Sequence, residues 1–483
     1  MNIDTPDWVR DAIFYQIFPD RFAKSERFGE DYPLKPSNLQ KWGSTPTLHG
    51  FQGGDLLGVI EKLDYLQELG INAIYFNPIF ASASNHRYHT HDYYVVDPIL
   101  GGNRAFKEML EAAHARNIRV ILDGVFNHAS RGFFQFNHLM ECGHESPYIN
   151  WFHVHNWPIN AFAHNQAPNY DAWWGLHSLP KFNTDNQAVR EYLLAVGEYW
   201  LKQGIDGWRL DVPNEIDDDA FWQEFRRRCK AINPDAYIVG ELWHEAHRWL
   251  QGDQFDGQMN YMFTRAVMGY FSGHRMDQSD TVKSGLGFIH ALNATHFAET
   301  LDHVFNKLYD PEIVFCLMNM LSSHDVPRML SIANLDKTAV RLMFMCQMTV
   351  PGVPNIYYGD EVGLAGQHDP DCRRAFPWHD ESVWDRELLD LVKQLIKLRH
   401  EHAVLRRGNF RILYANEHVM MYQREFEGET AVIAFNSAEH KEKIVAPPSI
   451  ENRLSEKLML AGQDFIAGKS YTINGRSGRI WVS

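Results

Sequence analysis

Acidic side chains stand at the ends of short apolar segments in this 483-residue chain, at Asp123, Asp211, Glu241 and Asp325. Arg209 and His324 accompany two of them. Carboxylates that gather at one place repel one another and lose hydration, so such a cluster is costly unless its charges take part in chemistry. Retaining glycoside hydrolysis requires such a set, because one carboxylate attacks the anomeric carbon while a protonated carboxyl, about 5–5.5 Å away, donates to the leaving oxygen.

Each of these acids also has a bland interpretation. An Asp directly after a strand is most often a helix N-cap or a turn residue, and Asp123 or Asp325 alone would be read that way. Asp211 and Glu241 come together with Arg209, which would keep a nearby carboxylate ionised, whereas burial would raise the pKa of the proton donor. The combination therefore favours a catalytic role.

The elements that carry these residues repeat one pattern, in which an amphipathic helix and a Gly or Pro stop precede a short apolar strand. Strands are predicted near residues 12, 71, 118, 205, 236, 257, 315 and 353. Alternation of strands and helices predicts the α/β class, and eight strands favour a closed (β/α)8 TIM barrel. Catalytic groups in such a barrel lie where the strands end, at the C-terminal face.

The spacing of the strands also predicts the domain organisation. Residues 1–128 and 181–402 are expected to form the barrel, and residues 129–180 a subdomain inserted after the third strand. The short alternating stretches of residues 403–483 predict a C-terminal antiparallel β-sandwich. The insertion is rich in Trp, which suits either a small core or the apolar faces of sugars.

Composition excludes several classes of protein. The formal charge of −15 argues against a nucleic-acid partner, and no apolar run approaches the length of a membrane span. The five cysteines are far apart, without CxxC spacing, and the histidines lack HExxH spacing, so neither a disulfide framework nor a metal site is predicted. The N-terminus does not resemble a secretory signal, and a cytoplasmic protein is expected.

Four segments, in this order, resemble the conserved regions of the α-amylase family of glycoside hydrolases (family 13): Asp123–His128, Gly207–Glu215, Gly240–His244 and Ser322–Asp325. Gly50–Asp55 and Gly352–Glu361 add to the resemblance, which covers nearly the whole chain. It implies that Asp211 is the nucleophile, Glu241 the acid/base and Asp325 the stabiliser of the transition state.

The resemblance also implies residues that bind the substrate. They are His86, Tyr88, Asp123, His128, Arg209, Glu215, His244, His324, Asp369 and Arg373. Among them, Arg209 would orient Asp211, Asp123 would mainly support the site, and Glu215 would lie at the acceptor subsite.

Three further segments are similar to the neopullulanase–cyclomaltodextrinase–maltogenic amylase group: Leu179–Asn183, Val212–Glu215 and Phe255–Tyr261. The implied activity is cleavage of α-1,4 bonds in cyclodextrins, short maltodextrins and pullulan, with some transglycosylation. An exo-acting α-glucosidase or a glucan transglycosylase is the alternative enzyme. A catalytically silent glucan-binding barrel is the non-enzymatic alternative, although such relatives lose the acids that are present here.

Two features depart from that group. The first strand begins near residue 12, so the N-terminal β-module of the group is expected to be absent; because that module normally helps to form the dimer, a homodimer is left open. Residues 21–30 lack the Asn/Asp-rich loop that binds calcium in relatives, and the stretch offers few carboxylates besides Glu26, Glu30 and Asp31. Calcium prefers several oxygen ligands, so no cofactor is expected to be required and structural calcium is disfavoured.

Overall fold

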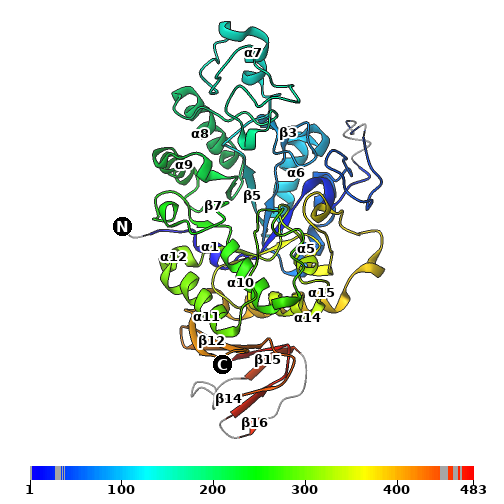
Figure 1. Cartoon of the computed structure of the whole chain (residues 1–483), viewed down its shortest axis with the longest axis vertical. Helices are drawn as coiled ribbons and strands as arrows, with labels where there is room; N and C mark the ends of the chain where they lie inside the picture. Colours follow the sequence, from blue (N-terminus) through cyan, green and yellow to red (C-terminus); the bar gives the residue numbers. More distant parts are fainter. Residues whose placement is uncertain are drawn as a thin grey trace.

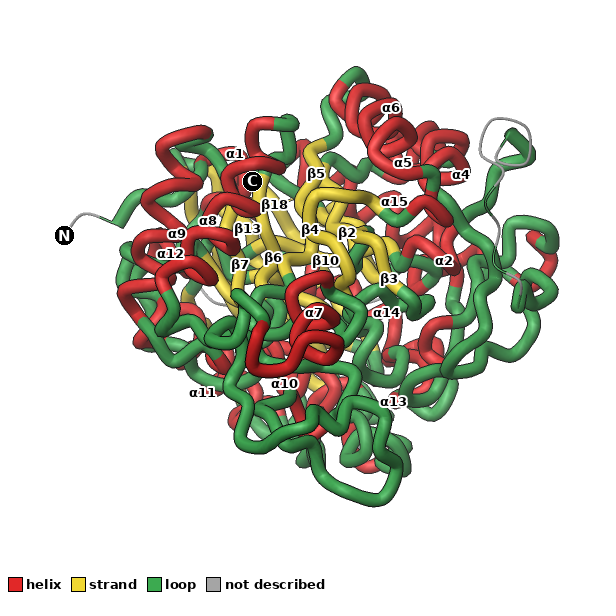
Figure 2. Tube along the Cα trace, turned by 90° about the horizontal axis from the view of Figure 1, so that it is seen from above, coloured by secondary structure: helices red, strands yellow, loops and turns green. Residues whose placement is uncertain are grey.

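Eight parallel strands form a closed barrel at the centre of the molecule (Figures 1 and 2). The computed structural model describes residues 3–27, 34, 36, 38–445, 455–460, 466, 467 and 470–483. The barrel strands are β1 (Phe14–Ile17), β2 (Ala73–Phe76), β5 (Arg119–Gly124), β6 (Gly207–Leu210), β7 (Tyr237–Gly240), β8 (Gly257–Gln258), β9 (Met318–Met320) and β10 (Val353–Tyr357). Each lies within a few residues of its predicted position, and the predicted TIM barrel is confirmed.

Two pairings complete the ring of strands, one between β1 and β10 and one between β8 and β9. β1 pairs in parallel with both β10 and β2. The last two neighbours, β8 and β9, meet through a bridge between Met259 and Met318, and the backbone N–H of Asn260 donates to the carbonyl of Met318 at 2.8 Å. This seam is therefore narrower than the other pairings of the barrel.

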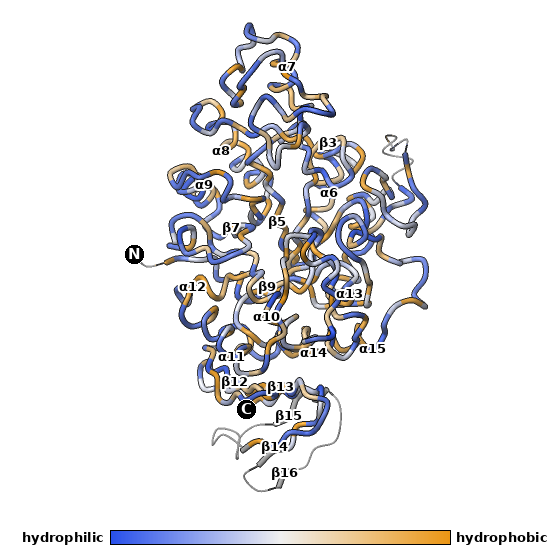
Figure 3. Tube along the Cα trace, in the orientation of Figure 1, coloured by the Kyte–Doolittle hydropathy of each residue, from blue (hydrophilic) through white to orange (hydrophobic). Residues whose placement is uncertain are grey.

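Helices surround the barrel and bury one face against it. Those of six or more residues around the barrel are α4 (Leu56–Glu61), α5 (Leu63–Leu69), α6 (Gly102–His114), α8 (Gln187–Lys202), α9 (Asp219–Ile232), α10 (Tyr261–Phe271), α11 (Ala294–Asp302), α14 (Lys337–Gln347) and α15 (Arg386–Glu401). Shorter helices are α1 (Asp7–Arg10), α2 (Pro19–Phe22), α12 (Pro311–Val314), α13 (Met329–Ile332) and α16 (Ala403–Arg407). Both hydropathy colours alternate along α9 (Figure 3), as expected for a helix with one face on the core.

Two segments rise from the C-terminal ends of the strands. A hairpin that the sequence pattern did not predict, β3 (Phe80–Ser82) with β4 (Thr90–Val96), follows β2 and carries His86 and Tyr88 in its loop. The predicted insertion follows the third barrel strand and contains α7 (Phe134–Cys142), seen in front of the strands in Figure 2. An isolated bridge between His128 and Lys181 ties its two ends together.

The C-terminal residues form two antiparallel sheets, at the bottom of Figure 1. The larger sheet contains β11 (Arg411–Ala415), β12 (Val419–Phe426), β13 (Glu429–Asn436), β18 (Ser477–Val482) and β15 (Ser455–Leu460); the smaller contains β14 (Glu442–Val445), β17 (Ser470–Ile473) and β16 (Ile466–Ala467).

Alternation along β12 and β13 explains the position of this domain. Met420 and Tyr422 belong to the same core as the barrel, whereas Val419 and Met421 join a second cluster that includes Ile444 of the smaller sheet. Successive side chains of a strand point to opposite faces, so one face of the larger sheet packs on the barrel and the other on the second sheet.

Two of the sequence predictions concern a calcium site and a membrane span. Of the carboxylates weighed as calcium ligands, Glu30 and Asp31 lie outside the described residues. No helix within the described ranges is both long and apolar enough to cross a membrane.

We predict that Gly207→Ala disrupts the barrel next to the catalytic strands. A Cβ at residue 207 would lie 2.0 Å from the carbonyl oxygen of Tyr237 in β7, and backbone cannot move aside cheaply. The loss of unfolding free energy should exceed about 4 kcal/mol, measured by denaturant titration. Gly143→Ala, where a Cβ meets nothing within 4 Å, is the control and should cost about 1 kcal/mol from its positive φ alone. Equal losses in both variants would contradict this account.

Candidate active site

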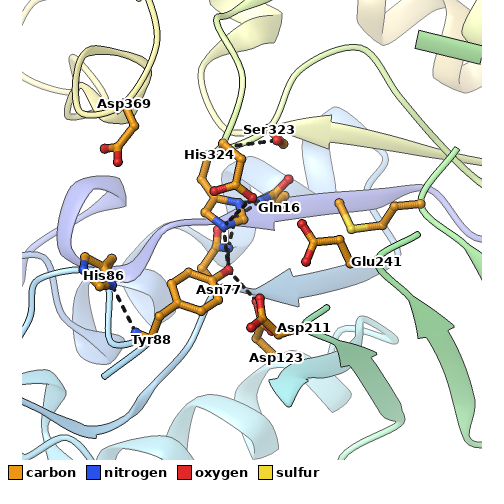
Figure 4. A network of polar contacts seen from close by, with 12 residues as sticks. Gln16, Asn77, His86, Tyr88, Asp123, Asp211, Glu241, Ser323, His324 and Asp369 are labelled. Carbon is orange, nitrogen blue, oxygen red and sulfur yellow. Dashed lines mark hydrogen bonds and ion pairs between the residues drawn. The ribbon is translucent and has the colours of Figure 1, made fainter. Parts of the chain in front are cut away.

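The guanidinium of Arg209 joins three of the predicted acids at the end of β6. Its Nη1 lies 2.8 Å from Oδ1 of Asp123 and 3.0 Å from Oδ1 of Asp211, and its Nη2 lies 3.0 Å from Oε2 of Glu241. The Arg209 and Asp123 side chains are fully buried, and those of Asp211 and Glu241 are 9% and 4% exposed. Figure 4 shows Asp123, Asp211 and Glu241 turned toward the same space as His324.

Burial sets the protonation of this cluster. Desolvation, followed by the charge of Glu241, raises the pKa of Asp211 well above its ordinary value, whereas Arg209 acts in the opposite direction. Burial also raises the pKa of Asp123. Neighbouring carboxylates share their protons as a group, and burial favours the protonated form of this one.

The backbone next to Asp211 is strained. Val212 has φ +35° and ψ 52°, in the left-handed region that a β-branched residue rarely adopts. This conformation lets its N–H donate to Oε2 of Glu241 at 3.0 Å. The indole N–H of Trp243 donates to Oε1 of the same carboxyl at 3.2 Å. Glu241 is thus held by donors on both oxygens, and the strain at Val212 places one of them.

Asp325 forms a second group of charges with Arg373. Nη2 of Arg373 lies 3.5 Å from Oδ1 of Asp325, and its Nη1 lies 2.8 Å from Asp369. The Nε–H of Arg373 donates to the carbonyl of His324 at 2.9 Å. Desolvation, followed by the charge of Glu241, raises the pKa of Asp325 to about 7, against the opposing effect of Arg373.

The tautomer of His324 follows from its neighbours. Its Nδ1 lies 3.0 Å from the side-chain amide nitrogen of Gln16 and 3.1 Å from that of Asn77. Both amides are donors, so Nδ1 accepts and the ring proton is on Nε2. That nitrogen lies 2.5 Å from the Tyr88 hydroxyl and 3.1 Å from Oδ2 of Asp325. Burial keeps the pKa of His324 well below its ordinary value, so the ring is neutral and donates through Nε2.

Tyr88 connects this histidine to the Arg209 cluster. Its ring stacks on that of His324 at 5.3 Å with an interplanar angle of 5°, and its hydroxyl donates to Oδ2 of Asp123 at 2.8 Å. The backbone N–H of Tyr88 donates to Nδ1 of His86 at 3.1 Å, which leaves Nε2 of that ring as the donor (Figure 4). Tyr88 therefore contacts both Asp123 of the Arg209 cluster and His324, which neighbours Asp325.

His128 contributes a ring at the base of the insertion. Burial lowers its pKa to about 3, so it is neutral, and Asn127 contacts its Nδ1 at 3.1 Å. Its buried Nε2 finds no hydrogen-bond partner among the described residues. Trp173 stacks on this ring at 5.4 Å, and the largely exposed Trp174 stacks on Trp173 at 4.5 Å. A row of rings thus leads from the buried histidine to solvent.

Two predicted substrate residues stand apart from these groups. Glu215 pairs with Lys181, with 3.0 Å between Oε2 and Nζ, so it joins the barrel to the end of the insertion. His244 is exposed on the loop after β7, and only its carbonyl makes a hydrogen bond in the described structure, with the side chain of Gln258. Their roles stay predictions.

The structure adds site residues that the sequence analysis did not single out. Gln16 and Asn77 fix His324, Tyr75 donates to Oδ2 of Asp123 at 2.8 Å, and Met259 contacts Nε of Arg209 through its sulfur at 3.3 Å. Gln16 carried a usable signal, because it is a polar residue inside the otherwise apolar β1. Tyr75 and Met259 carried none, since both are ordinary core residues.

The group of side chains best placed to share a metal ion lies away from Asp211, Glu241 and Asp325 in the described residues. In the part of the chain that the structure describes, the one group of three His, Cys, Asp or Glu side chains close enough to share an ion lies in the C-terminal domain.

Comparison with known proteins gives matches along nearly the whole chain. Residues 16–383 match the family model of the α-amylase catalytic domain, and residues 408–473 match that of the α-amylase C-terminal domain. A cyclomaltodextrinase from Geobacillus thermopakistaniensis is 41% identical over 96% of this chain and 74% of the relative. Neopullulanase 2 from Thermoactinomyces vulgaris is 41% identical over 91% of this chain and 72% of the relative. The crystal structure of a debranching enzyme from Nostoc punctiforme is 47% identical over the whole of both chains, with a TM-score of 0.90.

We predict that Asp325→Asn stabilises the protein in a pH-dependent manner. The pKa of this carboxyl rises from 3.8 in the unfolded chain to about 7 in the folded one, so the wild type loses stability as pH rises through about 7. Asn cannot ionise and avoids that loss. The Asp325 side chain is 29% exposed, so solvent screens part of this effect. The free energy of unfolding should therefore rise by about 2 kcal/mol at pH 8.

Thermal unfolding at several pH values measures this effect. The advantage of Asp325→Asn should shrink as pH falls toward 4. Asp277→Asn is the control of opposite sign, because the hydroxyl of Ser279 lowers the pKa of the partly exposed Asp277. Removal of this carboxylate should lower the free energy of unfolding slightly above pH 4. A gain for Asp325→Asn that does not depend on pH would contradict the proposed burial cost.

Proposed function

Because the chain belongs to the α-amylase family of glycoside hydrolases, we propose that it cleaves α-1,4 bonds of cyclodextrins and short maltodextrins with retention of configuration. The chain is a glycoside hydrolase of the cyclomaltodextrinase and maltogenic amylase type. One observation carries the finer proposal: Asp211 and Glu241 bind neighbouring nitrogens of one guanidinium. That arrangement favours the short separation of carboxyl groups that a retaining mechanism needs.

In the first step, Asp211 is the nucleophile and Glu241 the acid. An Oδ of Asp211 forms a bond to the anomeric carbon while the bond from that carbon to the leaving oxygen breaks, and the electron pair goes to that oxygen. The proton of the cluster passes from Glu241 to the same oxygen, so the leaving sugar departs neutral. Asp211 must be ionised to attack, and Arg209, at 3.0 Å, favours this form.

In the second step, water attacks the anomeric carbon of the glucosyl-enzyme. Glu241, now ionised, takes a proton from the water, and the bond to Asp211 breaks with its electrons returning to the carboxylate. Two inversions at the same carbon give net retention. Both oxygens of Glu241 are already contacted by N–H groups, which keep the carboxyl in place when it changes between acid and base.

Asp325 and His324 act on the sugar at the reacting carbon. The developing positive charge of the oxocarbenium-like state favours a carboxylate nearby, and sugar hydroxyls bind more tightly in that state. His324, neutral and protonated on Nε2, offers a donor rather than a positive charge. The stacked ring of Tyr88 offers an apolar face to the same sugar.

The acceptor subsite determines whether water or a sugar hydroxyl attacks the glucosyl-enzyme. Glu215 with Lys181, and the row of Trp173 and Trp174, lie where the insertion meets the barrel mouth. Aromatic faces favour a sugar over water. If a sugar hydroxyl attacks the glucosyl-enzyme in place of water, the product is a new glucoside, and we propose transglycosylation as a side activity of this site.

A second candidate function is the removal of branches at α-1,6 bonds. The specific observation in its favour is that the match with the Nostoc debranching enzyme extends over the whole of both chains, whereas this chain spans about three quarters of the Geobacillus cyclomaltodextrinase. The chemistry at Asp211 and Glu241 would be the same, and only the shape of the acceptor subsite would differ.

The proposal extends to location and organisation. All five cysteines are free thiols, and four of them are buried. Such thiols suit a reducing compartment, and we propose a cytoplasmic enzyme. We also keep the predicted boundaries of the barrel at 1–128 and 181–402, of the insertion at 129–180 and of the C-terminal sandwich at 403–483.

We predict that Asp211→Asn abolishes turnover, because an amide is neutral and does not attack the anomeric carbon. Hydrolysis of maltotriose or β-cyclodextrin should fall by about four orders of magnitude or more, while circular dichroism stays unchanged. For the wild type, NMR spectra recorded before mutarotation should show an α product. Unchanged turnover in Asp211→Asn would refute the nucleophile assignment, and a β product would refute retention.

The two candidate linkages are separated by a panel of substrates. We expect β-cyclodextrin and maltoheptaose to be cleaved faster than the branch point of maltosyl-β-cyclodextrin. Pullulan distinguishes them further, since its α-1,4 and α-1,6 cleavage products differ in linkage. Cleavage confined to α-1,6 bonds would replace the first proposal by the second, and glucose as the first product from maltoheptaose would favour an exo-acting α-glucosidase.

A further inference from the structure

Two loops of the C-terminal domain bring two imidazoles and a carboxylate together, outside the active site. His418 lies in the turn between β11 and β12, His440 in the connection from β13 to β14, and Glu442 at the start of β14. One potential ligand atom from each lies within 4.8 Å of the other two. Nε2 of His440 is 2.9 Å from Oε1 of Glu442, and the two imidazole rings are 5.3 Å apart at 85°.

We propose that His418, His440 and Glu442 bind a divalent transition-metal ion such as Zn²⁺. Imidazole nitrogen and carboxylate oxygen are both good ligands for Zn²⁺, which binds them at about 2.0–2.2 Å in a tetrahedral arrangement. Tetrahedral ligands are then about 3.3 Å apart. The pair of His440 and Glu442 is already close to that separation. The ligand atom of His418 lies within 4.8 Å of the other two, so it must approach by at most about 1.5 Å.

The side chains are free to make that adjustment, whereas their backbone is fixed. Their exposed fractions are 32% for His418, 65% for His440 and 20% for Glu442, so solvent and an ion can reach all three. A rotation about the side-chain torsions of His418 moves its ring without a change in the backbone. Water would occupy the fourth position, as in zinc sites with three protein ligands.

Backbone hydrogen bonds hold the two histidines in place. The carbonyl of His418 accepts from the Tyr270 hydroxyl at 2.8 Å and from the N–H of Ser437 at 3.1 Å. The carbonyl of His440 accepts from the side-chain amide of the buried Asn436 at 3.0 Å. The two loops are therefore also joined to each other through Ser437, so part of the ordering of the ligands is already present before an ion binds.

The charges around the group suit a cation. Glu417 places a second carboxylate 3.9 Å from Nε2 of His418. Lys441 and Lys443 flank Glu442 in the sequence, but alternate side chains of a strand point to opposite faces. Glu442 shares its face with the buried Ile444, so Lys443, which lies between them in β14, is directed to the other side of the strand.

A simple surface contact between His440 and Glu442 is the competing interpretation. The chain offers a comparison in the insertion, where Nε2 of His155 lies 2.7 Å from Oδ1 of Asp171 on similarly exposed side chains. That pair is not part of a group of three potential ligands among the described residues. The second imidazole, His418, is thus the feature that turns a hydrogen-bonded pair into a site.

Binding would affect how the C-terminal domain sits on the barrel. The turn that carries His418 contacts the start of α11, where the carbonyl of Glu417 accepts from the N–H of Ala294 at 3.1 Å and that of Asn416 from the Thr295 hydroxyl at 2.8 Å. An ion would link this turn to the connection between β13 and β14. Because a ligand that binds only the folded state stabilises it, the melting temperature should rise with Zn²⁺.

The test uses the full chain after treatment with a chelator, titrated with Zn²⁺ in a calorimeter. We expect one equivalent of Zn²⁺ whose affinity falls at least tenfold in His440→Gln and in His418→Gln, with no change in His155→Gln. Replacement of Zn²⁺ by Co²⁺ should give intense visible absorption of a four-coordinate ion, absent from His440→Gln. Melting without metal checks that the variants fold, and hydrolysis of β-cyclodextrin should stay unchanged.

Two results would overturn the proposal. One is an equal number of Zn²⁺ equivalents with equal affinity in the wild type, His440→Gln and His418→Gln, which would place any bound ion elsewhere, for example on the catalytic carboxylates. The other is the absence of a Zn²⁺-dependent rise in melting temperature together with a weak, six-coordinate Co²⁺ spectrum. Neither result depends on the substrate of the enzyme, so the proposed function is tested separately.

Discussion

The site depends on the ion pairs between the guanidinium of Arg209 and three carboxylates. Asp123, Asp211 and Glu241 are brought within 3.0 Å of one buried cation by three different strands. Without it, three carboxylates would share a space from which water is largely excluded, at a cost of several kcal/mol for each uncompensated charge. With it, part of the negative charge is compensated, and burial still favours the protonated form of Asp123 and Asp211. The barrel provides the necessary geometry because parallel strands all end at one face.

The remaining contacts arrange polar groups around that cation. Tyr88 and Tyr75 donate to Asp123, which leaves Asp211 with few donors of its own. Gln16 in β1 and Asn77 after β2 fix the ring of His324, so these two amides determine that Nε2 is the nitrogen that donates toward Tyr88 and Asp325. Two residues far apart in the sequence, Gln16 and Asn77, therefore determine which nitrogen of His324 carries the ring proton. The strained backbone of Val212 belongs to the same arrangement, since it directs an N–H to Glu241.

Much of this could be predicted from the sequence. The eight strands follow from apolar periodicity and from Gly and Pro stops, and the insertion was predicted from the long gap between the third and fourth strands. Asp211, Glu241 and Arg209 attracted attention because they lie at or just beyond the ends of such strands. The hairpin β3–β4 was not predicted, because β3 has only three residues and both strands are only partly buried. Tyr75 and Met259 could not be distinguished from core residues, since hydroxyl and sulfur contacts depend on side-chain directions that spacing does not contain. His244, which its motif predicts as a substrate-binding residue, is exposed to solvent, and its role stays a prediction.

The narrow seam between β8 and β9 has a dynamic consequence. β8 has two residues, and the pairing that closes the barrel rests on Met259 with Met318. Local opening of a fold is easiest where few backbone hydrogen bonds must break, so this seam is where the barrel is expected to breathe first. Met259 also contacts Arg209 through its sulfur. Fluctuations of the seam would therefore reach the guanidinium directly, and through it the carboxylates of Asp123, Asp211 and Glu241.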